Sequence, residues 1–174
     1  MSSVVISGDT SGAVTLTVPA VAGTNTVTLS NQTGTIYAAG PAFSAYQGTA
    51  QSVTSGTWTK VTFNTEEFDT NNNFASNRFT PTIAGYYQIN AGVASAVAAQ
   101  NYFASAIYKN GSIYKIGSSY STTVTVTPNS SVASLIYFNG STDYVEIYVI
   151  QATTGNTNPG IEQIYINGCL VRGA

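Results

Sequence analysis

The chain has 174 residues, enough for one all-β domain with a short appendage and too few for two large domains. Only 7% of the residues are charged while 43% are hydrophobic, so a core can be buried and Ser, Thr, Asn, Gln and Gly must supply most of the polar surface. The formal net charge of −2 argues against nucleic-acid binding, and the absence of histidine excludes Ser-His-Asp and Cys-His catalytic sites.

Residues 1–40 alternate aliphatic residues with threonine and contain almost no aromatic side chain. The alternation covers residues 13–18 and 26–30, and its period of two predicts strands with one buried face. Its aliphatic positions are Val14, Leu16, Val18, Val27 and Leu29. Two short strands without aromatic bulk cannot close a core, so we expect residues 1–40 to form an arm that packs against another chain or surface. The first residues lack the basic and apolar regions of a signal peptide, so no secretion signal is expected.

The composition changes near residues 38–41, and nearly all aromatic residues follow this point. Residues 41–174 are therefore expected to be a separate domain. Its first strand is expected at residues 42–46, and residues 58–64 predict an alternating strand. A polar loop and an aromatic-rich strand are expected next, the strand ending near residue 90.

The remainder of the chain also has the pattern of strands. Later strands are expected at residues 103–108, 134–138, 144–150 and 164–171. Residues 91–99 are rich in alanine, yet Gly92, Val93 and Val97 favour extended structure over a helix. The pairs Asn110-Gly111 and Asn139-Gly140 each predict a two-residue hairpin turn with positive φ.

Cys169 is the only cysteine, so no disulfide can form within the chain. Its neighbours Ile166, Leu170 and Val171 predict a small buried thiol rather than a reactive one. No apolar run approaches the length of a transmembrane helix, so no membrane insertion is expected.

Two motifs in residues 58–87 resemble the C1q/TNF-like jelly roll. They are Trp-x-x-Val-x-Phe-Asn and Phe-x-Pro-x-x-x-Gly-x-Tyr, matched here by Trp58, Val61, Phe63, Asn64, Phe79, Pro81, Gly85 and Tyr87. The resemblance covers most of residues 41–174 and implies an all-β, antiparallel jelly-roll sandwich. It also implies that three copies bury further aromatic residues along a common axis. The family's collagen stalk is absent, because Gly does not recur at every third residue.

The resemblance implies a binding or structural module without catalytic activity or cofactor. The aromatic residues expected in the core or at the trimer axis are Trp58, Phe63, Phe79, Tyr87 and Tyr148. The N-terminal ladders, ending in residues 29–36, resemble repetitive segments of bacteriophage fibre and virion appendage proteins.

Together the two resemblances imply a homotrimeric phage protein on the virion surface, assembled in the bacterial cytoplasm. The leading hypothesis is a capsid decoration or cement protein, whose arm binds the major capsid protein or another virion protein through the five aliphatic residues named above. The alternative is a short receptor-binding tail or head fibre that recognises a host surface glycan. A bacterial surface C1q-like lectin is a third hypothesis.

Two groups of residues are candidate sites. Glu66, Glu67 and Asp69 precede three asparagines, and such oxygens are ligands for calcium, although the spacing of a calcium loop is missing and a solvated connection is the alternative. The same carboxylates give no evidence of the opposed pair that a glycosidase needs. Ten tyrosines suit carbohydrate or protein contact where they are exposed, and core or trimer-axis positions otherwise. They are Tyr86, Tyr87, Tyr102, Tyr108, Tyr114, Tyr120, Tyr137, Tyr144, Tyr148 and Tyr165.

Overall fold

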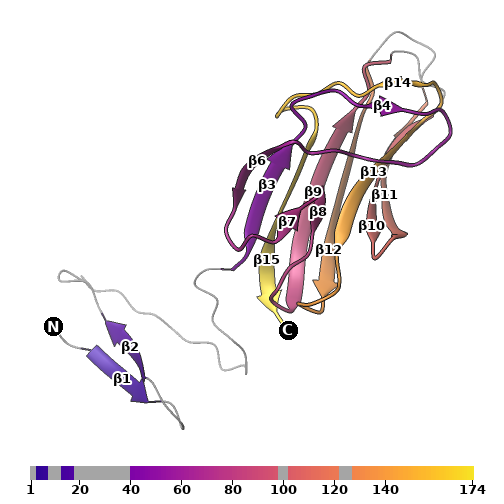
Figure 1. The fold of residues 1–174 in the computed structure, drawn as a ribbon. Helices are drawn as coiled ribbons and strands as arrows, with labels where there is room; N and C mark the ends of the chain where they lie inside the picture. The colour runs from indigo at the N-terminus through magenta and orange to yellow at the C-terminus, as the bar shows by residue number, and fades with distance from the viewer. Residues whose placement is uncertain (1–2, 8–12, 18–39, 98–101, 122–126) are drawn as a thin grey trace. The chain divides into compact units, whose positions relative to one another are not determined.

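The computed structural model describes residues 3–7, 13–17, 40–97, 102–121 and 127–174 (Figure 1). Two compact units divide the chain, residues 1–34 and residues 35–174. The expected boundary after residue 40 falls near the start of the second unit. Every regular element in the described residues is a strand. No helix among them is long and apolar enough to cross a membrane.

The strands follow the chain as β1 to β15. Their bounds are β1 Ser3–Ser7, β2 Ala13–Thr17, β3 Ala42–Tyr46, β4 Ser52–Val53, β5 Thr59–Lys60, β6 Thr65–Asp69, β7 Phe74–Ala75, β8 Arg78–Phe79, β9 Gly85–Ala94, β10 Phe103–Lys109, β11 Ser112–Tyr120, β12 Asn129–Phe138, β13 Val145–Gln151, β14 Gly155–Asn156 and β15 Tyr165–Gly173.

The first unit contains the antiparallel pair of β1 and β2, in which Val4 lies opposite Leu16 and Ile6 opposite Val14. The strand expected at residues 13–18 is therefore present as β2. Its partner β1 was not expected, because the sequence there has no threonine alternation. The ladder at residues 26–30 lies outside the described residues.

The second unit is a sandwich of two antiparallel sheets packed face to face (Figure 1). One has the order β12-β9-β15-β3-β6, and the other has the order β11-β10-β13-β8-β7 with β5 also paired to β13. The short strands β4 and β14 pair separately at one end. Apart from the hairpins β10-β11 and β7-β8, neighbours in each sheet come from distant parts of the sequence, which is the jelly-roll arrangement. This confirms the predicted all-β, antiparallel jelly-roll class.

An aromatic cluster fills the core between the sheets. Phe43 and Phe79 stack with ring centroids 4.1 Å apart, and Phe79 packs edge-on against Tyr87 and Phe138 at 5.6 and 6.0 Å. The phenol of Tyr87 donates a hydrogen bond to the Ile83 carbonyl at 2.8 Å, so its one polar atom is satisfied. Each such aromatic side chain stabilises the fold by about 1.5–3 kcal/mol through burial.

The glycine of the second motif allows β9 to approach β15 closely. A Cβ added to Gly85 would lie 2.4 Å from the Arg172 carbonyl oxygen and 2.7 Å from a methyl of Leu170. A larger residue would push these strands apart at the point where β15 has a bulge. The motif therefore places Phe79 and Tyr87 in the core, and it places Gly85 where the backbones of β9 and β15 approach each other closely.

Two segments differ from their expected structure. Only Thr59–Lys60 forms a strand within residues 58–64. After this strand, two backbone amides donate to side-chain oxygens instead of to a neighbouring strand. The Thr62 amide donates to Gln51 Oε1 at 2.6 Å, and the Phe63 amide donates to Asn77 Oδ1 at 2.7 Å. The expected polar loop instead begins with strand β6, which pairs with the open edge of β3.

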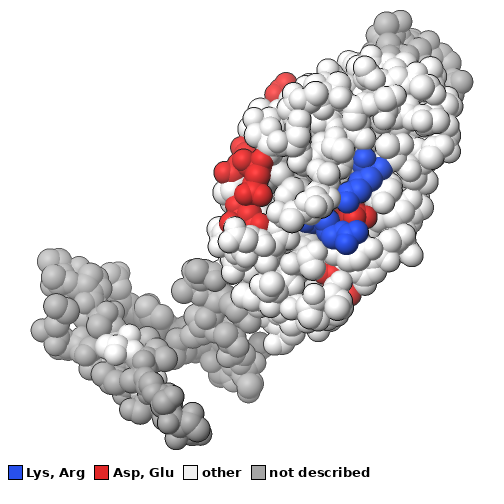
Figure 2. All heavy atoms as spheres, viewed as in Figure 1, with Lys and Arg blue, Asp and Glu red and all other residues white. Residues whose placement is uncertain are grey.

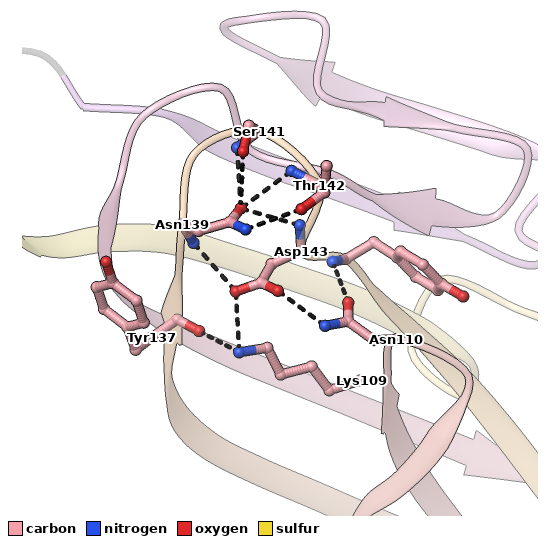
Figure 3. A network of polar contacts seen from close by, with 8 residues as sticks. Lys109, Asn110, Tyr137, Asn139, Ser141, Thr142 and Asp143 are labelled. Carbon is pink, nitrogen blue, oxygen red and sulfur yellow. Dashed lines mark hydrogen bonds and ion pairs between the residues drawn. The ribbon is translucent and has the colours of Figure 1, made fainter.

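Charged side chains are few on the surface and gather in small groups (Figure 2). One group involves the two Asn-Gly turns (Figure 3). Asn110 and Gly111 have φ of 51° and 82°, which confirms the predicted two-residue hairpin between β10 and β11. The same prediction for Asn139-Gly140 is wrong, because only Gly140 has positive φ and the flanking strands β12 and β13 belong to different sheets.

The loop at Asn139 is held by its own amide side chain. Asn139 Oδ1 accepts from the backbone amides of Ser141, Thr142 and Asp143, each at 3.0 Å (Figure 3). Asp143 in turn accepts from the Asn110 side chain at 2.8 Å and pairs with Lys109 at 3.1 Å. The hydrogen bond from Asn110, more than any other contact, lowers the pKa of Asp143. These contacts tie the end of one hairpin to the connection between the sheets.

Cys169 is exposed, so the expected buried thiol is wrong. Successive strand residues point to opposite faces, so Cys169 shares the solvent face of β15 with Asn167, while Ile166 and Gly168 point to the core. The apolar neighbours in sequence are not its neighbours in space.

Candidate interaction surface

The solvent side of the five-stranded sheet exposes a group of large apolar residues. Tyr86, Leu135, Tyr137 and Val171 are 42%, 51%, 43% and 59% exposed. They line a hollow of about 580 Å³ together with the C-terminal residues 172–174. We call this group the apolar face. Contiguous exposed apolar patches are a common feature of interaction sites, so the apolar face is a candidate for one.

Strand register and the alternation of side chains create the apolar face. Tyr86 on β9 lies directly opposite Tyr137 on β12, and their rings are 5.4 Å apart. On β15 the alternation continues from Cys169, so Leu170 packs against the core while Val171 points to solvent. The bulge that follows brings Arg172 opposite Tyr86, so Val171 and Arg172 are both exposed at this end of β15.

The centre of the same sheet carries neutral polar side chains. Gln88 donates to Asn90 at 3.0 Å, and Asn90 donates to Asn167 at 3.0 Å, which links β9 to β15. Phe68 on β6 extends the surface at the far edge and is 50% exposed. Exposed tyrosine and aliphatic residues, with amides and few charges, have the composition of a protein–protein interface.

A second exposed apolar group lies on strand β11. Ile113, Tyr114, Ile116 and Tyr120 are 46%, 41%, 53% and 45% exposed, although adjacent residues of a strand point to opposite sides. β11 is the terminal strand of its sheet and is paired only with β10. We call it the β11 edge. A long apolar edge strand is a template for contact with another chain.

Hydrogen bonds between serines hold this edge against β12. The Ser130 hydroxyl donates to the Ser118 carbonyl and bonds the Ser105 hydroxyl, the latter at 2.8 Å. Gly117 lies where a Cβ would be 2.3 Å from the Ser131 carbonyl oxygen, so the strands touch backbone to backbone. Because β12 also carries Leu135 and Tyr137, it connects the β11 edge to the apolar face within the second unit.

The solvent side of the six-stranded sheet carries a buried carboxylate between two cations. Glu146 Oε1 is 2.7 Å from Lys60 Nζ and 2.8 Å from Arg78 Nη2, and the Glu146 side chain is only 4% exposed. Burial raises the pKa of Glu146, but hydrogen bonds from Lys60 and Arg78 outweigh it, and the pKa lies below its usual value. Burial also raises the pKa of Tyr148, whose phenol donates to Glu146 Oε2 at 3.3 Å.

The aromatic residues expected in the core or at a trimer axis separate into two groups. Phe63, Phe79 and Tyr87 are buried in the core, at 6%, 0% and 0% exposure. Trp58 and Tyr148 are half-buried on the solvent side of the six-stranded sheet and do not belong to the core cluster. Tyr148 points outward because its neighbours Ile147 and Val149 on β13 point inward.

The three acidic residues proposed for calcium do not converge. Glu66 and Glu67 are exposed on edge strand β6, and Glu67 accepts a hydrogen bond from Ser44 at 2.7 Å. Asp69 accepts from the Asn71 and Phe74 amides at 3.2 and 2.6 Å. Acidic side chains follow the edge of the molecule where β6 lies (Figure 2). Across the described parts of the chain, no three His, Cys, Asp or Glu side chains group closely enough to hold a metal.

Of the arm residues expected to contact a partner, Val14 and Leu16 belong to β2. The other three, Val18, Val27 and Leu29, lie outside the described residues. Sequence reasoning did not single out Leu135, Val171 or the β11 edge. The alternation around Tyr137 could have placed Leu135 on the same side, but it could not show that this side is bare.

Comparisons with known proteins show a similarity in fold to solved structures. No family model matches the chain, and no curated protein sequence matches it. The globular domain of zebrafish complement 1qA protein matches with a TM-score of 0.61 and 17% identity, over 78% of this chain and 100% of that one. Murine APRIL matches with a TM-score of 0.61 and 7% identity, over 76% and 100% of the two chains.

The Eiger TNF of S. frugiperda matches with a TM-score of 0.58 and 9% identity, over 78% of this chain and 94% of that one. At these identities the likeness concerns the fold alone. The protein therefore has a C1q/TNF-like jelly-roll fold.

Proposed function

From the C1q/TNF-like fold we propose that the protein is a non-enzymatic phage structural protein, a homotrimeric capsid decoration or cement protein on the virion surface. The observation that carries the proposal is the apolar face, whose exposed tyrosine and aliphatic side chains have the composition of an interface between copies. The phage context rests on the resemblance of the N-terminal threonine-rich ladders, which end in residues 29–36, to segments of virion appendage proteins.

A ring of three copies uses both exposed apolar groups. Each copy presents the apolar face on one sheet and the β11 edge at the end of the other, so the two surfaces are different. A contact between unlike surfaces is head-to-tail, and it closes into a ring when the rotation between copies allows it. We propose that the β11 edge of each copy packs on the apolar face of the next.

The arm, residues 1–40, is proposed to hold the trimer on the capsid. Its described part is a two-stranded sheet, which is marginally stable in water on its own and gains stability by pairing with another surface. Ile6 in this sheet is 57% exposed. Three linked arms on one trimer bind with the avidity of connected sites, so a weak single contact suffices for attachment.

Imaging of purified particles with and without the gene tests this function. Many copies over the head, together with particles that rupture more readily after deletion of the gene, are the expected result. A few copies at the tail with loss of adsorption would contradict it and would support the second candidate.

The second candidate is a short receptor-binding fibre that recognises a host surface glycan. It is favoured by the half-buried aromatic residues Trp58, Tyr108 and Tyr148 on the solvent side of the six-stranded sheet. Aromatic rings beside polar groups suit contact with sugars. Copy number and position on the particle distinguish the two candidates.

A further inference from the structure

We propose that the solvent side of the six-stranded sheet carries a binding site for acidic glycans, that is, for a sugar ring that bears a carboxylate. The inference rests on the glycan recognition of the second candidate function and gives it a ligand class and a place. Two features of this side support the inference. One is an aromatic platform, and the other is a pair of cations that share a single carboxylate, so that one positive charge remains.

The aromatic platform consists of Trp58, Tyr108 and Tyr148. The rings of Tyr108 and Tyr148 are stacked with centroids 3.9 Å apart, and Trp58 meets Tyr108 edge-on at 6.1 Å. On β10, Ala106 lies opposite Tyr148 and is fully buried. All three rings are half-buried, so part of each remains open to solvent. The apolar face of a sugar ring packs against such open rings.

The cations beside the platform leave one positive charge uncompensated. Lys60 and Arg78 share the single carboxylate of Glu146, in a chain whose net charge is −2. The side chains of Lys60 and Arg78 are 30% and 41% exposed, whereas that of Glu146 is 4% exposed. Solvent therefore meets the cations and not the carboxylate, as Figure 2 shows for the basic side chains grouped around a largely covered acidic one. This arrangement is complementary to an anion.

Surrounding contacts hold both cations in place before any ligand arrives. Arg78 Nε and Nη2 both contact Glu146 Oε1, and the guanidinium lies 3.7 Å over the ring of Tyr144. Lys60 Nζ also donates to the Ser76 carbonyl at 2.9 Å. Fixed donors lose little conformational entropy on binding, which favours a ligand site over a merely solvated surface. One cation would suffice to neutralise Glu146, so the second is not needed for the ion pair itself.

The position on the molecule agrees with the proposed assembly. The platform lies on the solvent side of one sheet, and the apolar face lies on the solvent side of the other. Because the two sheets pack face to face, contact through the apolar face leaves the platform open to solution. The β11 edge, which makes the second contact of the proposed ring, lies in the platform's own sheet, next to the strand β10 that carries Tyr108.

The full-length protein provides its own reporter, because Trp58 is the single tryptophan of the chain. We would titrate the protein with trigalacturonate and with 3′-sialyllactose and record the tryptophan emission. The matched neutral ligands are the methyl ester of trigalacturonate and lactose. The expected result is a saturable change with the acidic sugars and binding at least about tenfold weaker for the neutral ones, the effect of one charge-assisted hydrogen bond.

Variants test the role of the cations. Arg78→Gln is expected to weaken binding of the acidic sugars about tenfold and to remove the preference over the neutral ones. Lys109→Gln removes a charge of the same sign from the ion pair with Asp143, on the side of β10 opposite to Tyr108, and is expected to change binding less than about twofold. If Arg78→Gln proves poorly folded by circular dichroism, the preference of the unchanged protein for acid over ester still decides the question.

The inference is overturned if no acidic sugar gives a saturable change up to about 10 mM. Equal affinity for acid and ester overturns it as well, as does equal weakening by the two variants. Light scattering on the same samples reports the oligomeric state separately. If the protein is a trimer but does not bind acidic sugars, only the glycan site is refuted. If it is a monomer that binds them, only the trimer is refuted.

Discussion

Replacement of Leu135 with serine should dissociate the proposed trimer without unfolding the domain. Full burial of a leucine stabilises by about 1.5–3 kcal/mol, and 51% of Leu135 is exposed in one copy. Covering that half contributes roughly 0.8–1.5 kcal/mol per copy, or roughly 2.4–4.5 kcal/mol in a trimer. Leu135→Ser should therefore weaken trimer association by about two to three orders of magnitude.

The domain itself should remain folded, because Leu135 points to solvent while its neighbour Ile136 points to the core. Ile161 is equally exposed, at 51%, but lies in the turn before β15, so Ile161→Ser is the matched control. Sedimentation over a range of concentrations measures the association, and thermal melting checks the fold. An unchanged trimer in Leu135→Ser, or equal loss in both variants, would refute the reasoning.

Four further predictions concern the core, the buried carboxylate and the arm. Gly85→Ala should destabilise the domain by about 1–3 kcal/mol in urea unfolding, since its Cβ meets the Arg172 carbonyl at 2.4 Å; an unchanged midpoint would contradict this. The pKa of Glu146 in the folded protein lies below its ordinary value of 4.5, so the ionised carboxylate stabilises the fold fully above pH 4.5. This contribution to stability is lost as the pH falls through the lowered pKa. Glu146→Gln should accordingly show a smaller loss of stability on acidification than the unchanged protein, and an equal loss would exclude this ion pair as a cause. Leu16→Asn should leave the domain folded and abolish attachment to capsids, so persistent attachment would argue against the arm. Deletion of residues 1–40 should leave a folded trimer, which light scattering can check; a monomeric or unfolded product would contradict the proposed boundary.

The period of two in the sequence was enough to predict an all-β chain and its longer strands, such as β9, β10, β13 and β15, while the jelly roll followed from the family resemblance. It also separated inward from outward residues wherever a strand has strict alternation, and the Phe-x-Pro-x-x-x-Gly-x-Tyr motif marked two of the core aromatics. Phe79 and Tyr87 meet in the core because local spacing and sheet register agree there. The direction of each side chain depends on the local backbone geometry of its strand, and residues adjacent in the sequence determine that geometry.

Only the tertiary structure decided whether the outward side of each strand is covered by another part of the protein or exposed to solvent. Alternation cannot tell whether the outward side of a strand is covered, so it could not show that Trp58 and Tyr148 form an open platform or that Cys169 is exposed. Glu146 obtains its two cations from β5 and β8, far away in the sequence. Long-range register sets these positions, and the sequence pattern of a single strand contains no information about its partners.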